Sequence, residues 1–512
     1  MASQPPTDEV ERASNTRGAL VWSLFSVYAT RGAKLLGTVV LARILLPEDF
    51  GVMAMAWAFL AFIANFGSLG LPAYIVRLPR LDQRTLNTVF WLNLTIAALL
   101  ALVTLAVAPL AGLVYRDPRV GEVLAVLSLV TLSIGLSPVP AGLLRRRMRF
   151  GRLAIVDLGQ AASEVCTSVS LAALGYGVWA LVCGTLAGRA ARISLLYVVQ
   201  PFVPALAWCR RAARDAVGFA TGMLGTSVST VIGRNIDNAI IGAGLGAHGL
   251  GLYAFANRLM RMPGEDLVGS LVRVLVPRLA AARDDNEMAS LVRRSVGASA
   301  AVVGPILVTL AVTAPWLVPL VFGQKWTYAV PLFQILAPVA ILQSALRVPL
   351  QVYIVKGRTR LLFAWTAFYT AVCLGALLCG LPFGLYGVAV ACVVAHALLI
   401  YPWIRLPKLA LPTLNVRQIA IDLAIHGLIA GFAATLGCVT VYLLEQRTST
   451  AISHATAGAI VLLTFATLYL TLRPIGIDDL LAMIFPNTLR KRIALLVGSD
   501  RSRCAVQTTD QT

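Results

Sequence analysis

The stretch RGAKLLGTVVLARILLPEDFGVMAMA, residues 31–56, contains the pattern that decides the fold of this chain. It joins the end of one apolar segment to the start of a second through the short turn LPED. When residue i is aligned with residue i+200, the stretch matches residues 231–256 without a gap, and Lys34 falls opposite Arg234. Other aligned pairs that are identical or similar include Leu41 with Ile241, Leu45 with Leu245, Gly51 with Gly251, Ala54 with Ala254 and Ala56 with Ala256. Agreement at one fixed spacing indicates an internal repeat.

The composition outside this stretch is that of a membrane protein. The 512 residues are 58% hydrophobic and 13% charged, with a mean hydropathy of +0.80, whereas a soluble domain has about 25% charged residues. These values exclude a water-soluble fold. A membrane-spanning helix needs about 20 mainly apolar residues, and fourteen segments of this kind can be marked along the chain. They lie at 19–40, 50–71, 86–113, 121–143, 154–174, 177–199, 216–241, 249–271, 295–313, 328–350, 361–380, 384–404, 418–444 and 453–472.

The repeat and the span count together predict the architecture. Six spans separate the two copies, so both copies have the same orientation in the membrane, and the repeats are parallel. The predicted fold is an all-α polytopic membrane protein, with about 14 transmembrane helices in two pseudo-symmetric six-helix lobes plus two C-terminal helices. Its expected parts are a cytoplasmic N-terminal tail at 1–18, an N-lobe at 19–200, a cytoplasmic linker at 201–215, a C-lobe at 216–410, spans 13 and 14 at 411–472, and a cytoplasmic amphipathic tail at 473–512. The segment Ile477–Leu495 of that tail is too polar to span and is expected to lie on the membrane surface.

The distribution of basic residues predicts the orientation. The chain has 43 Lys and Arg against 23 Asp and Glu, and 32 of the basic residues fall in segments on one side of the predicted spans, with five on the other. Cytoplasmic loops carry the excess of Lys and Arg, so both termini are expected in the cytoplasm. The basic clusters then face membrane lipid rather than nucleic acid. The polar residues 1–18 lack the apolar core of a cleaved signal peptide.

Several patterns that could indicate a cofactor or a metal have simpler interpretations. The eight cysteines form no CxxC pair, and the four histidines have no metal-ligand spacing. Gly244, Gly246 and Gly249 match GxGxxG, but no strand precedes them, so they predict a tight turn between two helices. Asp284 and Asp285 lie in a charge-rich loop that is expected to be solvated. The sequence therefore predicts no cofactor, no metal and no catalytic residue.

Ionisable residues inside the predicted spans are the candidate functional residues, because each costs a few kcal/mol unless it faces protein or water. Basic residues matched in both repeats predict a cationic central cavity, which suits an anionic substrate. The predicted cavity residues are Arg31, Lys34, Arg234, Asp237, Arg258, Arg261 and Arg347, and the candidate ion-coupling residues are Asp157 and Glu164. For Arg261, Arg347 and Asp157, snorkelling or a structural ion pair is an equal alternative.

Longer stretches resemble a known family. They include LARILLPEDFGVMAMA (41–56), RRRMRFGRLAIVDLGQ (145–160), IDNAIIGAGLGAHGLGLYAFANRLMRMP (236–263) and FGQKWTYAVPLFQILA (322–337). These stretches are similar to the polysaccharide-transporter branch of the multidrug/oligosaccharidyl-lipid/polysaccharide flippase superfamily, and within it to Wzx-type flippases of the colanic acid and succinoglycan exporter kind.

The resemblance implies a two-lobed bundle in the bacterial inner membrane that flips an undecaprenyl-pyrophosphate-linked repeat unit by alternating access, without covalent catalysis. The expected partners are this lipid-linked oligosaccharide, membrane lipids and a polysaccharide polymerase or export machinery. One alternative is a cation-coupled drug exporter of the same superfamily, which needs an acidic cavity and for which Asp157, Glu164, Asp237 and Asp422 are the candidates. Another is a membrane-embedded glycosyltransferase or polymerase, which needs a catalytic carboxylate or a large catalytic loop.

Overall fold

Every regular element in the part of the chain that the structure describes is a helix. The computed structural model describes residues 7–68, 74–75, 82–472 and 474. Within these residues, nine helical segments are long and apolar enough to cross a membrane. Each of the fourteen predicted spans falls on a described helix, spans seven and eight together occupying α9 and the helices that follow it. The predicted all-α polytopic fold is confirmed. The predicted surface helix at Ile477–Leu495 lies outside the described residues.

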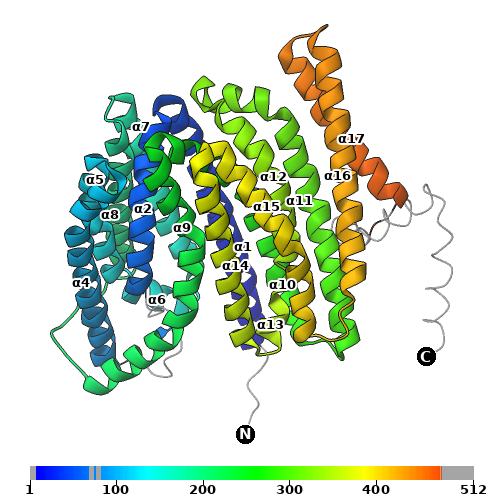
Figure 1. Ribbon diagram of the computed structural model, residues 1–512. Coiled ribbons are helices and arrows are strands. Elements are labelled where there is room, and N and C mark those ends of the chain that lie inside the picture. The colour runs from blue at the N-terminus through cyan, green and yellow to red at the C-terminus, as the bar shows by residue number, and fades with distance from the viewer. Residues whose placement is uncertain (1–6, 69–73, 76–81, 473, 475–512) are drawn as a thin grey trace. The chain divides into compact units, whose positions relative to one another are not determined.

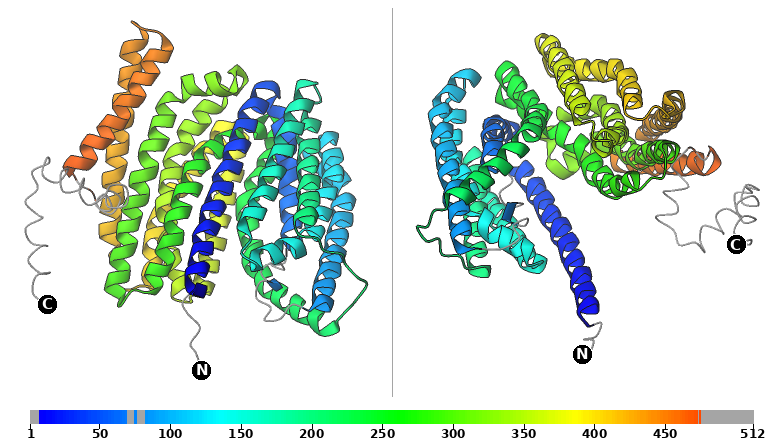
Figure 2. Two further views of the ribbon diagram at one scale, coloured as in Figure 1. Left: turned by 180° about the vertical axis from the view of Figure 1, so that it is seen from behind. Right: turned by 90° about the horizontal axis from the view of Figure 1, so that it is seen from below.

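The chain forms two compact units. The first comprises Met1–Ala254 with Val321–Trp326, and the second comprises Phe255–Leu320 with Thr327–Thr512. Within each unit the long helices run roughly parallel to one another (Figures 1 and 2). The lobe boundaries expected from the sequence, 19–200 and 216–410, remain a prediction.

The described part of the first unit contains eight helices and one short 3-10 helix. They are α1 (Thr7–Ile44), α2 (Pro47–Ser68), α4 (Gln83–Tyr115), α5 (Pro118–Leu136), α6 (Pro138–Arg146), α7 (Phe150–Ala173), α8 (Val178–Val199), most of α9 (Arg210–Pro263) and η2 (Gln324–Trp326). The indole of Trp326 is fully buried and donates to the carbonyl oxygen of Ala42 over 2.9 Å. This bond ties a segment from far along the chain to the end of α1.

The second unit contains the remaining helices. They are the end of α9, η1 (Gly264–Val268), α10 (Gly269–Ala280), α11 (Asp285–Phe322), α12 (Ala329–Leu346), α13 (Gln351–Val355), α14 (Thr359–Gly380), η3 (Leu381–Phe383), α15 (Gly384–Arg405), η4 (Leu406–Leu409), α16 (Val416–Glu445) and α17 (Thr450–Leu472). Helices α16 and α17 pack on each other and against α11 through an apolar cluster. Its buried members include Val308, Ala433, Val461 and Phe465.

A reciprocal contact in the first unit confirms the repeat. A Cβ atom added to Gly51 would lie 1.8 Å from the carbonyl oxygen of Ala247, and one added to Gly251 would lie 1.9 Å from the carbonyl oxygen of Pro47. The two contacts correspond, because Gly251 is 200 residues after Gly51 and Ala247 is 200 residues after Pro47. In a two-fold arrangement, each contact between the two copies occurs twice, with the roles of the copies reversed. The contacts of Gly51 and Gly251 have this property.

The predicted tight turn between spans seven and eight is also present. Helix α9 is interrupted at Gly246, where φ is 74° and ψ is −178°. This backbone conformation is open essentially only to glycine. The letters GxGxxG therefore mark a turn between helices, as expected.

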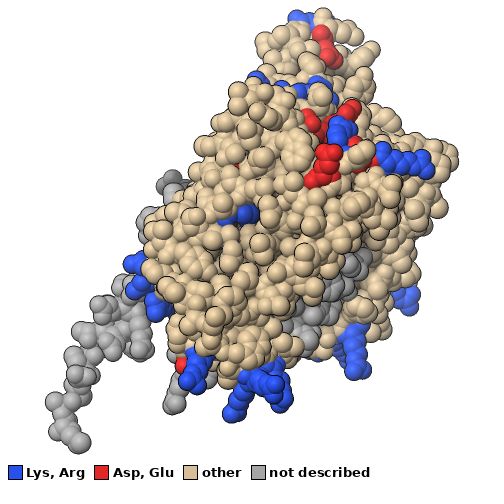
Figure 3. Space-filling view, turned by 90° about the vertical axis from the view of Figure 1, so that its left-hand side faces the viewer, with Lys and Arg blue, Asp and Glu red and all other residues tan. Residues whose placement is uncertain are grey.

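Charge is unevenly distributed over the surface. Figure 3 shows a face with a broad band that carries few charged side chains, while Lys and Arg gather along its lower edge and acidic side chains lie near the upper edge. A band with few charges between charged rims suits a protein surface that contacts lipid.

Candidate functional site

The candidate site in the first unit is an array of charged side chains on α1, α7 and α8. Lys34 on α1 and Glu164 on α7 form an ion pair with 2.8 Å between Nζ and Oε2. Their side chains are 41% and 27% exposed. Arg31 lies one turn before Lys34 on the same side of α1 and is exposed. Lys34 was predicted to bind the substrate and Glu164 to couple an ion, and the structure shows that the two residues form an ion pair.

A second ion pair joins α7 to α8. Nη1 of Arg192 lies 2.5 Å from Oδ1 of Asp157 and 3.0 Å from Oε1 of Gln160. Arg189, one turn earlier on α8, interacts electrostatically with Glu164 and with Arg192. The array thus runs along α7 from Asp157 to Glu164, with a basic partner at each end.

Glycines on α8 bring that helix against α7 at Glu164. A Cβ atom at Gly184 would lie 1.8 Å from Oγ of Ser168 and 2.8 Å from the carbonyl oxygen of Glu164. A Cβ atom at Gly188 would lie 2.8 Å from Cβ of Glu164. Small residues four apart let two membrane helices approach closely. This packing fixes the position of the α7 backbone that carries Glu164.

The other predicted residues of the first unit are placed less fully. Arg234 belongs to α9, but its side chain lies outside the described residues. Asp237, one turn further, is half-buried, and its Oδ1 accepts a hydrogen bond from the backbone N–H of Asn238 over 2.9 Å.

Three predicted cavity residues belong to the second unit. Arg258 is exposed near the end of α9, and Nε of Arg261 donates to Oδ1 of Asn257 over 3.0 Å. Arg347 follows the last residue of α12 and is half-buried. The sites predicted from the sequence thus divide between the two units.

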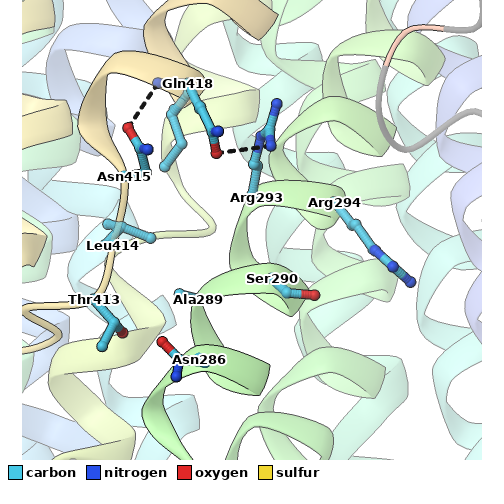
Figure 4. Close-up of a pocket in the computed structure, with 10 residues that line it drawn as sticks. Asn286, Ala289, Ser290, Arg293, Arg294, Thr413, Leu414, Asn415 and Gln418 are labelled. Carbon is cyan, nitrogen blue, oxygen red and sulfur yellow. Dashed lines mark hydrogen bonds between the residues drawn. The ribbon is translucent and has the colours of Figure 1, made fainter.

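Asp422, which was a candidate for an acidic drug site, is engaged in a structural pair. Nε and Nη2 of Arg293 lie 2.5 Å and 3.0 Å from its two carboxylate oxygens, and Nη1 of Arg293 donates to Gln418 over 2.8 Å. These residues lie beside a polar cavity of about 350 Å³ between the start of α11 and the start of α16. In Figure 4, Arg293 points toward Gln418, whereas Arg294 points away from it. The bidentate pair neutralises Arg293 and holds α16 on α11.

Sequence reasoning missed Arg189 and Arg192 as site residues. The charge count assigned both to a cytoplasmic segment, but the structure places them inside α8. Their spacing of three along an apolar helix, with Gly188 beside them, was the signal that could have found them. Among the described residues, no group of three or more His, Cys, Asp or Glu is arranged to hold a metal ion.

A two-unit bundle of long apolar helices, with ion pairs set among them, defines a polytopic membrane transporter. The chain belongs to the polysaccharide biosynthesis protein family, whose model matches residues 40–331. It is 30% identical over 366 residues to the succinoglycan biosynthesis transport protein ExoT of Rhizobium meliloti strain 1021, covering 70% of this chain and 73% of that protein. It is 25% identical to the lipopolysaccharide biosynthesis protein WzxC of Escherichia coli K12, covering 70% of this chain and 74% of that protein.

Two solved membrane-protein structures have the same fold as this chain. The lipid II flippase MurJ in an inward closed conformation aligns with a TM-score of 0.68 and 14% identity, covering 87% of this chain and 98% of MurJ. An inward-facing multidrug resistance MATE family transporter of the MOP superfamily aligns with a TM-score of 0.64 and 15% identity, covering 77% of this chain and 98% of that one. This chain therefore shares its fold with MurJ and with the MATE family transporter.

Proposed function

We propose that this protein is a flippase that moves an undecaprenyl-pyrophosphate-linked oligosaccharide repeat unit from the cytoplasmic to the periplasmic leaflet of the bacterial inner membrane, for exopolysaccharide or O-antigen synthesis. It acts by alternating access, with both termini in the cytoplasm, and without covalent catalysis. Family membership and relatives named for succinoglycan transport and lipopolysaccharide biosynthesis support a saccharide cargo.

The observation that carries the proposal is the charge balance of the array in the first unit. The array contains four basic side chains, Arg31 and Lys34 on α1 and Arg189 and Arg192 on α8, but only two carboxylates, Asp157 and Glu164 on α7. Such an excess of positive charge favours an anionic head group. It disfavours the alternative of a cationic-drug exporter, because both carboxylates are already paired with basic residues.

The Lys34–Glu164 pair gives the site a resting state. Without cargo, the carboxylate neutralises the ammonium group, so that neither charge is left unpaired among apolar helices. A pyrophosphate carries more negative charge than one carboxylate and offers more acceptor oxygens, so it competes with Glu164 for Lys34. When the cargo binds, Lys34 exchanges its ion pair with Glu164 for one with the pyrophosphate. The ammonium group of Lys34 is therefore never left without a negative partner.

The test is polymer export from a flippase-null strain that expresses each variant, normalised to the amount of protein in the membrane. The wild-type chain should restore export, and the Arg31→Ala, Lys34→Ala double variant should lose most of it. Lys356→Ala is the matched control, since Lys356 also pairs with a carboxylate, that of Asp285 at 2.5 Å, but lies in the second unit. Full export by the double variant at normal protein level would remove the cationic-site mechanism.

A further inference from the structure

The segment that joins α8 to α9, residues 201–209, is not helical but is held against α4 (Figure 1). On its inner face, Phe202 is buried and packs on Phe90 of α4 with 5.8 Å between the ring centroids. Nε1 of Trp91, also on α4, donates to the carbonyl oxygen of Ala205 over 3.0 Å. The segment therefore has one face that is fixed to the first unit.

The outer face of this segment carries large apolar side chains. Val203 is 83% exposed, Leu206 is 91% exposed and Trp208 is 57% exposed. Val198, in the last turn of α8, is 75% exposed, so the exposed apolar surface of that helix continues onto the segment. Because the inner face is held on α4, the outer side chains are presented in a defined place. Exposed apolar groups of this size mark a surface that contacts another molecule or a membrane.

The start of α9 adds positive charge next to these apolar side chains. Three exposed arginines lie in its first two turns, namely Arg210, Arg211 and Arg214. On the other side of the helix, Ala212 and Ala216 are buried, so the helix presents its arginines outward. The three arginines and one aspartate, Asp215, give residues 201–217 a net charge of +2.

Two further arginines lie at the other end of the segment. Nη1 of Arg147 donates to Oε1 of Gln200 over 3.2 Å, and Nη1 of Arg152 donates to the carbonyl oxygen of Val199 over 3.1 Å. Both acceptors are neutral groups, so these bonds place two positive charges beside the segment without neutralising them. Arginines therefore border the exposed apolar side chains on both sides along the chain.

This combination of side chains fits the surface of an anionic bilayer. An exposed Trp and aliphatic side chains beside arginines suit the boundary where acyl chains meet charged head groups. Each basic residue near an anionic membrane surface strengthens the attraction by about fivefold. The apolar surface is also continuous with that of α8, a helix long and apolar enough to cross a membrane. These features favour lipid over a protein partner.

We propose that residues 203–214 form an interfacial surface that binds anionic phospholipids. The apolar side chains of Val203, Leu206 and Trp208 lie among the acyl chains, and the arginines of α9 lie at the phosphate groups. The lipid is the bulk glycerophospholipid of the leaflet that the expected orientation places at the cytoplasm. The inference does not depend on the cargo named in the proposed function.

The test uses the purified full-length chain in lipid nanodiscs without cargo. Leu206→Cys in a cysteine-free variant carries an environment-sensitive fluorescent label, whose quenching is measured with nitroxide-labelled lipid and with aqueous iodide. We expect the lipid to quench the label and iodide to quench it little. Quenching by the lipid should be stronger in nanodiscs that contain phosphatidylglycerol than in phosphatidylcholine alone.

A charge variant separates the contribution of the arginines from that of the apolar side chains. The Arg210→Gln, Arg211→Gln, Arg214→Gln triple variant should lose most of the dependence on phosphatidylglycerol and keep the quenching seen in phosphatidylcholine. The matched control is Arg358→Gln, Arg360→Gln, which removes two exposed arginines at the start of α14 in the second unit. This control should leave the label at residue 206 unchanged.

The outcomes are distinct from those of the flippase test, because no cargo is present. Strong quenching by iodide in both kinds of nanodisc would overturn the membrane contact and leave this surface to a protein partner. Equal quenching by lipid with and without phosphatidylglycerol would overturn the preference for anionic lipid. An unchanged dependence on phosphatidylglycerol in the triple variant would overturn the role of the α9 arginines.

Discussion

Lys34 and Glu164 are paired but partly exposed, and pairs of this kind contribute only about 0–1 kcal/mol to stability. The pair therefore contributes little to the stability of the fold. Substitutions at either residue should change ligand binding more than they change folding. The two residues are also expected to have opposite effects on the affinity for an anionic ligand, because one is basic and the other acidic.

Glu164→Gln should strengthen binding of farnesyl pyrophosphate by about twofold to fivefold, because the competing carboxylate is removed while its volume is kept. Lys34→Ala should weaken binding, and Lys34→Arg should retain it, since a guanidinium can also pair with phosphate oxygens. The measurement is equilibrium binding to the purified chain in nanodiscs. Weaker binding by Glu164→Gln than by the wild type would show that the carboxylate does not compete with the ligand.

Asp117, at the start of α5, allows a prediction of pH-dependent stability. Its Oδ1 accepts from the backbone N–H of Arg119 over 3.1 Å, and the Arg119 guanidinium lies 2.8 Å from Oδ2. The Arg119 hydrogen bonds hold the pKa of the Asp117 carboxyl below its usual value. A group whose pKa is lower in the folded state stabilises the fold above its unfolded pKa, and the contribution is lost as pH falls through the folded pKa.

Asp117→Ala should therefore lower stability by roughly 1 kcal/mol at pH 7, the usual cost of losing a helix N-cap. The difference from the wild type should begin to shrink below about pH 4, the usual range of an Asp carboxyl, and should be lost as the pH falls through the lower pKa of the folded state. Thermal unfolding of both proteins in detergent between pH 3 and pH 7 measures this. A stability difference that stays constant across the range would mean that the carboxylate charge plays no part.

At the scale of the helix, the contact between the start of α2 and the second half of α9 has no room for side chains. Gly51→Ala or Gly251→Ala would place a methyl group inside van der Waals contact of a backbone carbonyl, so one of the two segments must shift. Each change should reduce transport and lower the thermal midpoint. Gly375→Ala on α14 is the control, because nothing lies within 4 Å of a Cβ atom there. Equal behaviour of Gly51→Ala and Gly375→Ala would contradict the close contact.

The helices were largely predictable from the sequence, because apolar length alone marks a membrane span. The turn at Gly246 was predicted from the glycines between two apolar segments, and the repeat aligned Gly51 with Gly251. The contacts that these two glycines make are visible only in the structure. Helix boundaries were less accurate. Helix α1 begins at Thr7 and α11 at Asp285, since a helix continues into polar sequence where hydropathy no longer marks it.

The side-chain partnerships were not predictable in the same way. Periodicity gives the face of a helix but not the neighbouring helix, so Lys34 and Glu164, 130 residues apart, were assigned separate roles. His396 likewise meets Tyr369 and Gln343, which lie 27 and 53 residues away along the chain. Distant partners of this kind become visible only when the helices are packed.

For the whole molecule, the orientation in the membrane is the first property to test. The basic loop around Arg145–Arg152 is expected in the cytoplasm, and the loops around Arg116 and Lys325 in the periplasm. Single cysteines placed in these loops of a cysteine-free variant, probed in intact cells with an impermeant thiol reagent, should label only in the second group. Labelling at Arg145–Arg152 from outside would contradict cytoplasmic termini.

The central claim is that this chain alone moves a diphosphate-linked saccharide lipid across a bilayer through a cationic site. The most direct measurement is transfer of an undecaprenyl-pyrophosphate-linked oligosaccharide, labelled on its sugar, between the leaflets of liposomes that contain the purified protein. We predict transfer well above that of empty liposomes for the wild type and for Lys356→Ala, and little transfer for the Arg31→Ala, Lys34→Ala double variant. Wild-type transfer no faster than in empty liposomes, or full transfer by the double variant, would contradict the account.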